Sequence, residues 1–318
     1  MEVQRSGEYW FDDGNIVLQA EQTQFRVTKS MLAMHSTVFR DMLTIPLPPD
    51  EPVIDGCPIV FLPDDKPEDW KHLLDAMYPK RQATSFHWQS WPSQNPTLDV
   101  IHSILRLSRK YDVPAFRQEC IRRLKLEFPS TFEGLEAVWG AWKHIEMDPG
   151  RGDINTVFQL INLSREFNLP SLLPLACYIV AASSSKEAMQ RVSDGTSVPP
   201  LSVADQLICW KGHVELIKRG AVSKMAWLEA IGAEDSDCQH PNTCAKVARV
   251  ILYHHGRQPE KSLSLINHWS PRWATGACEN CLRRARQVYL EGRRENWENL
   301  PAIFGFPPWE TLREMDSE

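Results

Sequence analysis

The chain has 318 residues, of which 42% are hydrophobic and 24% are charged, and its formal net charge is −6. These shares are typical of globular proteins, and the length predicts two or three domains. The acidic balance argues against a direct nucleic-acid partner. No apolar run has the length of a signal-peptide core or a membrane span, so we expect an intracellular protein, cytoplasmic or nuclear, without a membrane partner. In those compartments the eight cysteines should be reduced or metal-bound.

Alternating apolar residues predict strands near the N-terminus. Ile16, Leu18 and Ala20 stand at every second position, residues 21–23 are polar, and Phe25 and Val27 resume the alternation. This pattern predicts a β-hairpin with one buried face. The residues before it, 1–9, are mainly polar and are interpreted as a tail.

The hydrophobic period changes from two to helical over residues 29–43. Six apolar residues there have helical spacing within each short segment: Met31, Leu32, Val38, Phe39, Met42 and Leu43. Such spacing predicts a common apolar face on a pair of short helices. Ser36 interrupts the pattern and is a typical N-cap, because its hydroxyl can accept a hydrogen bond from a free amide of the second helix.

A third strand and a longer helix are predicted next. Residues 59–62 form a short apolar run bounded by prolines, which favours a strand. Residues 64–78 return to helical spacing, and Pro79 is expected to end that helix. Residues 80–96 are interpreted as an exposed insertion. The apolar positions of the helix are Trp70, Leu73, Leu74 and Met77.

Two motifs in this part resemble the hallmarks of the BTB/POZ domain. The first is a strand ending in lysine that leads into a helix, a serine and a second short helix, carried by Phe25, Lys29, Ser30, Leu32, Ala33, Ser36, Phe39 and Leu43. The second is a helix, an aromatic residue, an Asp-x-Pro break and a helix with a cysteine, carried by Leu107, Tyr111, Asp112, Val113, Pro114 and Cys120. One departure is Thr28, where many family members have histidine.

The resemblance implies an α+β domain over residues 10–128, with a short three-stranded sheet and helices. In the family this domain forms homodimers through its leading strand and helix, and such contacts are usually two-fold symmetric. The residues expected at the dimer interface are Trp10, Phe11, Met31 and Met34.

The same resemblance implies protein partners. Some relatives bring substrates to a cullin-type ubiquitin ligase, and others recruit transcriptional corepressors. Residues 46–58 lack the apolar-x-Glu element that cullin-binding members often carry. We therefore expect a self-associating adaptor or scaffold, with a ligase substrate receptor as the alternative.

The remainder of the chain is predicted to be mainly helical. Residues 104–114 align without gaps to residues 160–170, and both copies end in Asp or Asn followed two residues later by proline. Asp or Asn can adopt the left-handed conformation that ends a helix, and proline suits the first turn of the next. We expect a helical extension over residues 129–200, a break near 183–200, and a helical C-terminal domain over 201–318.

Apolar residues at helical spacing support this division. One set is Ile154, Val157, Phe158 and Ile161, and another is Val203, Leu207, Trp210, Val214 and Ile217. The closing segment, residues 297–309, is similar to the tail of a branch of BTB proteins found in fungi. Its aromatic residues either fold back onto a helix, which we favour, or form a docking patch.

Four cysteines form a candidate metal site. Cys238 and Cys244 are spaced C-x5-C with His240 between them, and Cys278 and Cys281 form a C-x-x-C pair. Four thiolates can hold one structural zinc, although the first spacing is longer than in common zinc knuckles. The alternative is that they are ordinary buried residues, as free cysteines often are. The remaining cysteines lie on apolar faces and are predicted to be core residues: Cys57, Cys120, Cys177 and Cys209.

No common catalytic signature is present in the sequence. It lacks the GxxxxGK[ST] phosphate loop, the GxGxxG fingerprint, the GxSxG elbow and the HExxH zinc pair. We therefore expect no catalytic residues and no cofactor other than the candidate zinc. A zinc-dependent enzyme built on the cysteines is the remaining alternative.

Overall fold

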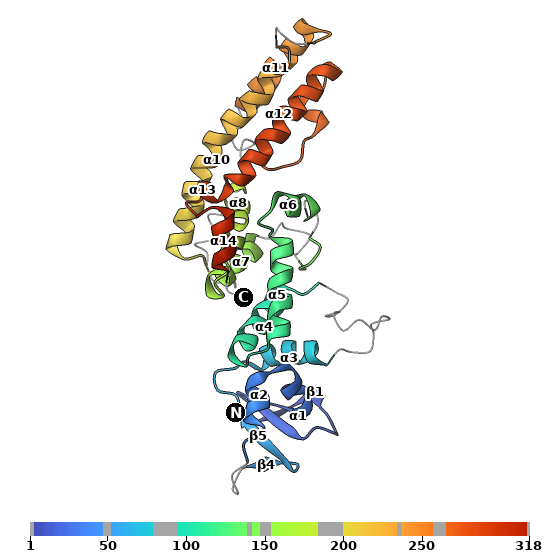
Figure 1. The fold of residues 1–318 in the computed structure, drawn as a ribbon, viewed down its shortest axis with the longest axis vertical. Helices are drawn as coiled ribbons and strands as arrows, with labels where there is room; N and C mark the ends of the chain where they lie inside the picture. Colours follow the sequence, from blue (N-terminus) through green and yellow to red (C-terminus); the bar gives the residue numbers. More distant parts are fainter. Residues whose placement is uncertain are drawn as a thin grey trace. The chain divides into compact units, whose positions relative to one another are not determined.

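The computed structural model describes residues 3–46, 52–78, 95–138, 142–146, 154–183, 200–233, 237–256 and 265–316. The chain folds as two compact units (Figure 1). The first holds Met1–Glu127 and Gly140–Met147, and the second holds Phe128–Trp139 and Asp148–Ser317. Pro79, the predicted insertion up to residue 94 and most of the predicted break near residue 190 lie outside the described residues, and the subdivision at residue 200 stays a prediction.

A five-stranded sheet forms the base of the first unit, in the order β1-β3-β2-β5-β4. The hairpin predicted from alternation is confirmed, because β2 and β3 pair antiparallel with Leu18 opposite Phe25. Strand β5 pairs parallel with β2 and places Ile59 opposite Val17. The strands are β1 (Gln4–Trp10), β2 (Ile16–Ala20), β3 (Thr23–Val27), β4 (Val53–Ile54) and β5 (Cys57–Phe61).

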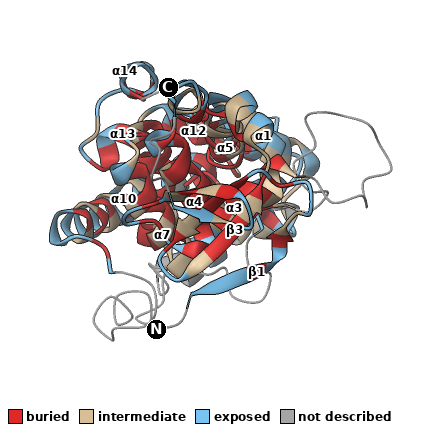
Figure 2. Cartoon of the chain, turned by 90° about the horizontal axis from the view of Figure 1, so that it is seen from below, coloured by how far each residue is buried: buried red, intermediate tan, exposed pale blue. Residues whose placement is uncertain are grey.

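Two of these strands were not expected, so the interpretation of residues 1–9 as a tail is wrong. Strand β1 pairs parallel with β3 at the edge of the sheet and is exposed along most of its length (Figure 2). Only Ser6 and Tyr9 are buried in it, so its sequence has no apolar alternation to reveal a strand. Strand β4 has two residues, too few for any pattern.

The helices of the first unit close over a core of aromatic side chains. Ser36 caps α2 as predicted, because its Oγ accepts from the Phe39 N–H at 3.0 Å. The same hydroxyl donates to the Tyr111 carbonyl at 2.5 Å, which ties the two hallmark motifs together. The Phe39 ring stacks on Tyr111 and meets Trp70 edge-on. The helices are α1 (Lys29–His35), α2 (Thr37–Met42), α3 (Pro67–Met77), α4 (Leu98–Lys110) and α5 (Pro114–Glu127).

The repeated helix break has the predicted conformation in both copies. Asp112 has φ 47° and Asn168 has φ 52°, so both lie in the left-handed region. In each copy the N–H of the following residue donates to the carbonyl five residues before it. The Val113 N–H donates to the Ser108 carbonyl, and the Leu169 N–H donates to the Ser164 carbonyl. These hydrogen bonds satisfy carbonyls at the helix end.

All regular elements in the described residues of the second unit are helices. Helix α8 packs on α7 and on α10, and α10 lies beside α12 (Figure 1). No helix in the described part of the chain is long and apolar enough to cross a membrane. The elements are α6 (Phe132–Val138), α7 (Ile154–Glu166), η1 (Pro170–Leu172), α8 (Leu173–Ala182), α10 (Val203–Glu229), α11 (Pro241–Gly256), η3 (Pro271–Ala274), α12 (Glu279–Glu298), α13 (Leu300–Ile303) and α14 (Trp309–Met315).

The aromatic tail folds back onto its own unit, as we favoured. The Trp309 ring stacks on Trp297, and its Nε1 donates to the Trp297 carbonyl at 2.9 Å. Both side chains are buried. Phe304 packs so closely on Gly212 of α10 that a Cβ at that glycine would lie 2.0 Å from the ring. The tail is therefore part of the core of the second unit.

Candidate metal centre and interaction surfaces

The structure brings the two predicted cysteine pairs together. The four sulfur atoms of Cys238, Cys244, Cys278 and Cys281, here called the cysteine cluster, all lie within 4.8 Å of one another. The Cys238 and Cys278 sulfurs are 3.8 Å apart. Cys278 is the N-cap of α12, Cys281 lies in its first turn, and Cys244 lies in the first turn of α11. The cluster therefore joins two helix N-termini.

Backbone amides donate hydrogen bonds to these sulfurs. The Cys278 N–H donates to the Cys244 sulfur at 3.2 Å, and the Gly232 N–H donates to the Cys281 sulfur at 3.3 Å. Backbone N–H groups, first that of Cys281, lower the pKa of the Cys278 thiol to about 6. Burial raises the pKa of the Cys244 and Cys281 thiols. The backbone hydrogen bonds therefore favour the thiolate form, whereas burial favours the neutral thiol.

Neighbouring side chains close the cluster on several sides. Arg284 contacts the Cys281 sulfur at 3.4 Å through Nη2 and pairs with Asp237 through Nη1. His240 is exposed and is not part of the sulfur group. A hydrophobic core surrounds the cluster: Trp227, Leu228, Ile231, Ala274, Ala285 and Tyr289.

The four cysteines predicted to be core residues, at positions 57, 120, 177 and 209, are all buried, which confirms that prediction.

The residues predicted at the dimer interface differ in exposure. Met34 on α1 is 63% exposed, whereas Met31 is half-buried. Trp10 is partly buried against the Val17 cluster and lies under Arg5, whose guanidinium carbon is 4.4 Å from the ring centroid. Phe11 is partly buried too and packs on the Tyr78 ring. Among the four, Met34 is therefore the side chain that is most available to a second copy.

Helix α10 has an exposed apolar face that sequence reasoning did not identify as exposed. This face, here called the outer face of α10, has five apolar residues at alternating steps of four and three. They are Val203, Leu207, Trp210, Val214 and Ile217. Their exposed fractions run from 36% at Ile217 to 80% at Val203. Because a helix has 3.6 residues per turn, this face lies opposite Cys209 and Leu216, which are buried in the second unit. Helix α10 is thus apolar on two sides.

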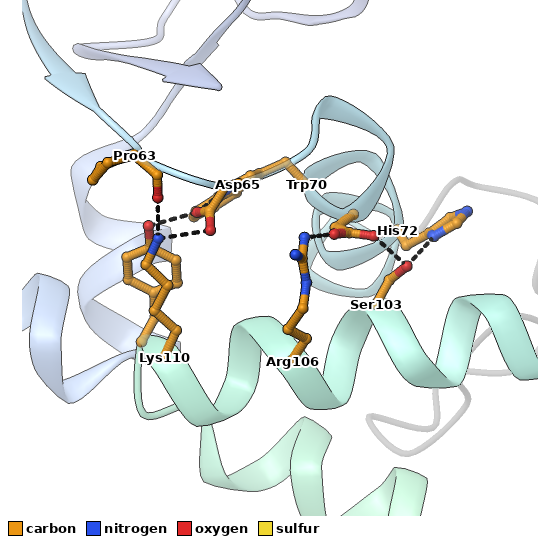
Figure 3. A network of polar contacts seen from close by, with 9 residues as sticks. Pro63, Asp65, Trp70, His72, Ser103, Arg106 and Lys110 are labelled. Carbon is orange, nitrogen blue, oxygen red and sulfur yellow. Dashed lines mark hydrogen bonds and ion pairs between the residues drawn. The ribbon is translucent and has the colours of Figure 1, made fainter. Parts of the chain in front are cut away.

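A buried polar network links α3 to α4 in the first unit (Figure 3). Asp65 accepts hydrogen bonds from Trp70 Nε1 at 2.9 Å, from the Tyr111 hydroxyl at 2.6 Å and from Lys110 Nζ at 2.7 Å. A second carboxylate, that of Asp69, forms an ion pair with Arg106. These contacts fix the helix that carries the second hallmark against the rest of the unit.

The network also brings together residue types found in catalytic triads. The Ser103 hydroxyl donates to Asp69 at 2.6 Å and lies 3.1 Å from His72 Nδ1. In a triad the histidine lies between serine and carboxylate and takes the serine proton. Here serine lies in the middle, and Arg106 neutralises the carboxylate. Burial also lowers the pKa of His72. This order of contacts suits a structural link between two helices.

The first unit is an α+β domain, with a small mixed sheet and short helices. Residues 5–127 match the model of the BTB/POZ domain family. This part of the chain is therefore a BTB/POZ domain, as its two hallmark motifs indicated, and a mostly helical half follows it. BTB/POZ domains are in general protein–protein interaction modules. A comparison of the chain with curated proteins found no match.

Proposed function

We propose that this protein is a non-enzymatic, intracellular adaptor that self-associates through its BTB/POZ domain and binds a second protein on the outer face of α10. The observation that supports the adaptor role is that α10 is apolar on two opposite sides, of which the second unit covers one. A surface helix normally has one apolar stripe, which faces its own core, and polar residues opposite, so the core of the second unit does not account for a second apolar side. Contiguous exposed apolar surface marks interaction sites.

The spacing of the outer face favours a helix as its partner. Steps of four and three residues form the seam that a second helix fills with its own apolar side chains. Two exposed lysines, Lys211 and Lys218, border the seam on the same side. Lys218 already pairs with Glu215 at 3.7 Å, so we infer an amphipathic partner helix with a carboxylate opposite Lys211. Exposed ion pairs add only about 0–1 kcal/mol each, so the charges would set orientation more than affinity.

Self-association is supported by the exposure of Met34 in the BTB/POZ domain. Met34 is an exposed methionine on a short helix. A two-fold axis would bring it against Met34 of the second copy, or against residues next to it. Two copies of the helical half in one dimer would bind a two-site partner with higher avidity than one copy. The adaptor would then act by assembly.

Affinity capture of the full chain from its native cells tests the adaptor role. We compare wild type with Leu207→Asp on the outer face and with the control Val250→Asp on α11, since the two residues are similarly exposed at 50% and 48%. A partner lost with Leu207→Asp but kept with Val250→Asp is expected. A helical segment of that partner, made as a peptide, should bind wild type directly.

Other outcomes of the same experiment have different meanings. Identical protein sets from all three chains would refute docking on α10. Cullin and ring-protein peptides together with one enriched target would make the protein a ligase substrate receptor, whereas transcriptional regulators would indicate a scaffold of that kind. If the Leu207→Asp chain still captures other copies of itself, dimerisation does not depend on the outer face of α10.

A further inference from the structure

We propose that the cysteine cluster binds one Zn²⁺ in a closed tetrahedral site. Zinc binds thiolate sulfur at about 2.3 Å, so the sulfurs at the corners of its tetrahedron lie about 3.8 Å apart. The Cys238 and Cys278 sulfurs are separated by 3.8 Å, and all four sulfurs lie within 4.8 Å of one another. The side chains are thus arranged around a common centre of the size that zinc requires.

The hydrogen bonds around the sulfurs support the same assignment. Four thiolates and one Zn²⁺ carry a net charge of −2, which nearby donors must offset. The amides of Gly232 and Cys278 and the guanidinium of Arg284 all donate to sulfur. Groups that donate hydrogen bonds to the ligand atoms of a metal site orient those ligands and stabilise their charge. Gly232 has φ +76°, and a Cβ there would lie 2.9 Å from the Ala245 amide nitrogen, so glycine permits this close approach.

The alternatives fit the arrangement less well. A disulfide requires sulfurs about 2.05 Å apart, and all four cysteines are free. A buried cysteine that only fills core space needs no convergence of four sulfurs, whereas these four meet although Cys238 and Cys278, for example, are 40 residues apart in the sequence. Cys244 and Cys281 are fully buried. A zinc ion accounts for this convergence, because each of the four sulfurs would donate a lone pair to the same ion.

A closed site makes zinc structural rather than catalytic. Four protein ligands complete the tetrahedron, so no position remains for water or substrate. The ion would fasten the start of α11 and the start of α12 together, close to the end of α10. Because binding energy at such a site is folding energy, losing the ion should open this end of the helical half. The proposal does not depend on the adaptor function.

Metal analysis of the purified full chain tests the proposal. We expect about one zinc per chain by mass spectrometry of the metals, in wild type and in Cys209→Ser, a buried cysteine outside the cluster. The double variant Cys278→Ser/Cys281→Ser should lose the zinc. Hydrogen exchange should then rise in α11 and the first turns of α12, while the BTB/POZ domain keeps its protection.

A second measurement guards against a double variant that fails to fold. Wild type exchanged into Co²⁺ should show the thiolate-to-cobalt charge-transfer and visible bands of a tetrahedral site. A thiol-specific mercurial should release the wild-type zinc in step with titration of four thiols. A wild-type chain without zinc, iron in its place, or zinc that persists in the double variant would each overturn the assignment.

Discussion

Replacing Met34 by glutamate tests where the BTB/POZ domain self-associates. Full burial of a methionine side chain stabilises by about 1.5–3 kcal/mol. Met34 is 63% exposed, so covering it in an interface would contribute about 1–2 kcal/mol per copy. A two-fold axis doubles this to about 2–4 kcal/mol. Met34→Glu should therefore weaken dimerisation by about 30- to 700-fold, and by more if the carboxylates face each other.

Sedimentation and light scattering over a concentration series measure this change. The matched control is Met315→Glu on α14, where the methionine is 48% exposed in the other unit. We expect wild type and the control to dimerise at the same concentration, and Met34→Glu to remain a folded monomer by circular dichroism. A Met34→Glu dimer as tight as wild type would refute the placement of the interface, and a monomeric wild type would refute self-association.

Two further predictions concern stability. Asp65→Ala leaves buried Trp70 and Tyr111 without their acceptor, so the free energy of unfolding should fall by about 2–6 kcal/mol in urea titrations. Asp65→Asn keeps one acceptor oxygen and should cost less than half as much; equal losses would contradict the hydrogen-bond explanation. Burial raises the pKa of Tyr289 to about 12, so the folded state keeps a proton that the unfolded state loses above about pH 10. Stability should therefore fall between about pH 10 and 12, and Tyr289→Phe should reduce that fall; identical pH profiles would rule out this contribution.

The sequence by itself determined the local structure at positions where a particular type of residue suits a particular backbone hydrogen bond or backbone conformation. Ser36 marked a helix start because its hydroxyl reaches an amide three residues on. Asp112 and Asn168 marked helix ends because they tolerate positive φ. The spacing of Ile16, Leu18 and Ala20, a polar turn, and the spacing of Phe25 and Val27 predicted the hairpin that the structure has. The two hallmark motifs were sufficient to identify the BTB/POZ domain.

The tertiary structure alone decided features that depend on partners distant in sequence. Strand β1 pairs through backbone groups at a sheet edge, which require no apolar side chains. Helix α10 is apolar on two sides, so its pattern does not say which one the rest of the unit covers. The C-x5-C and C-x-x-C pairs were visible in the sequence, but their meeting depends on how α11 packs against the start of α12. Local patterns report local geometry, whereas these contacts arise from the packing of whole elements.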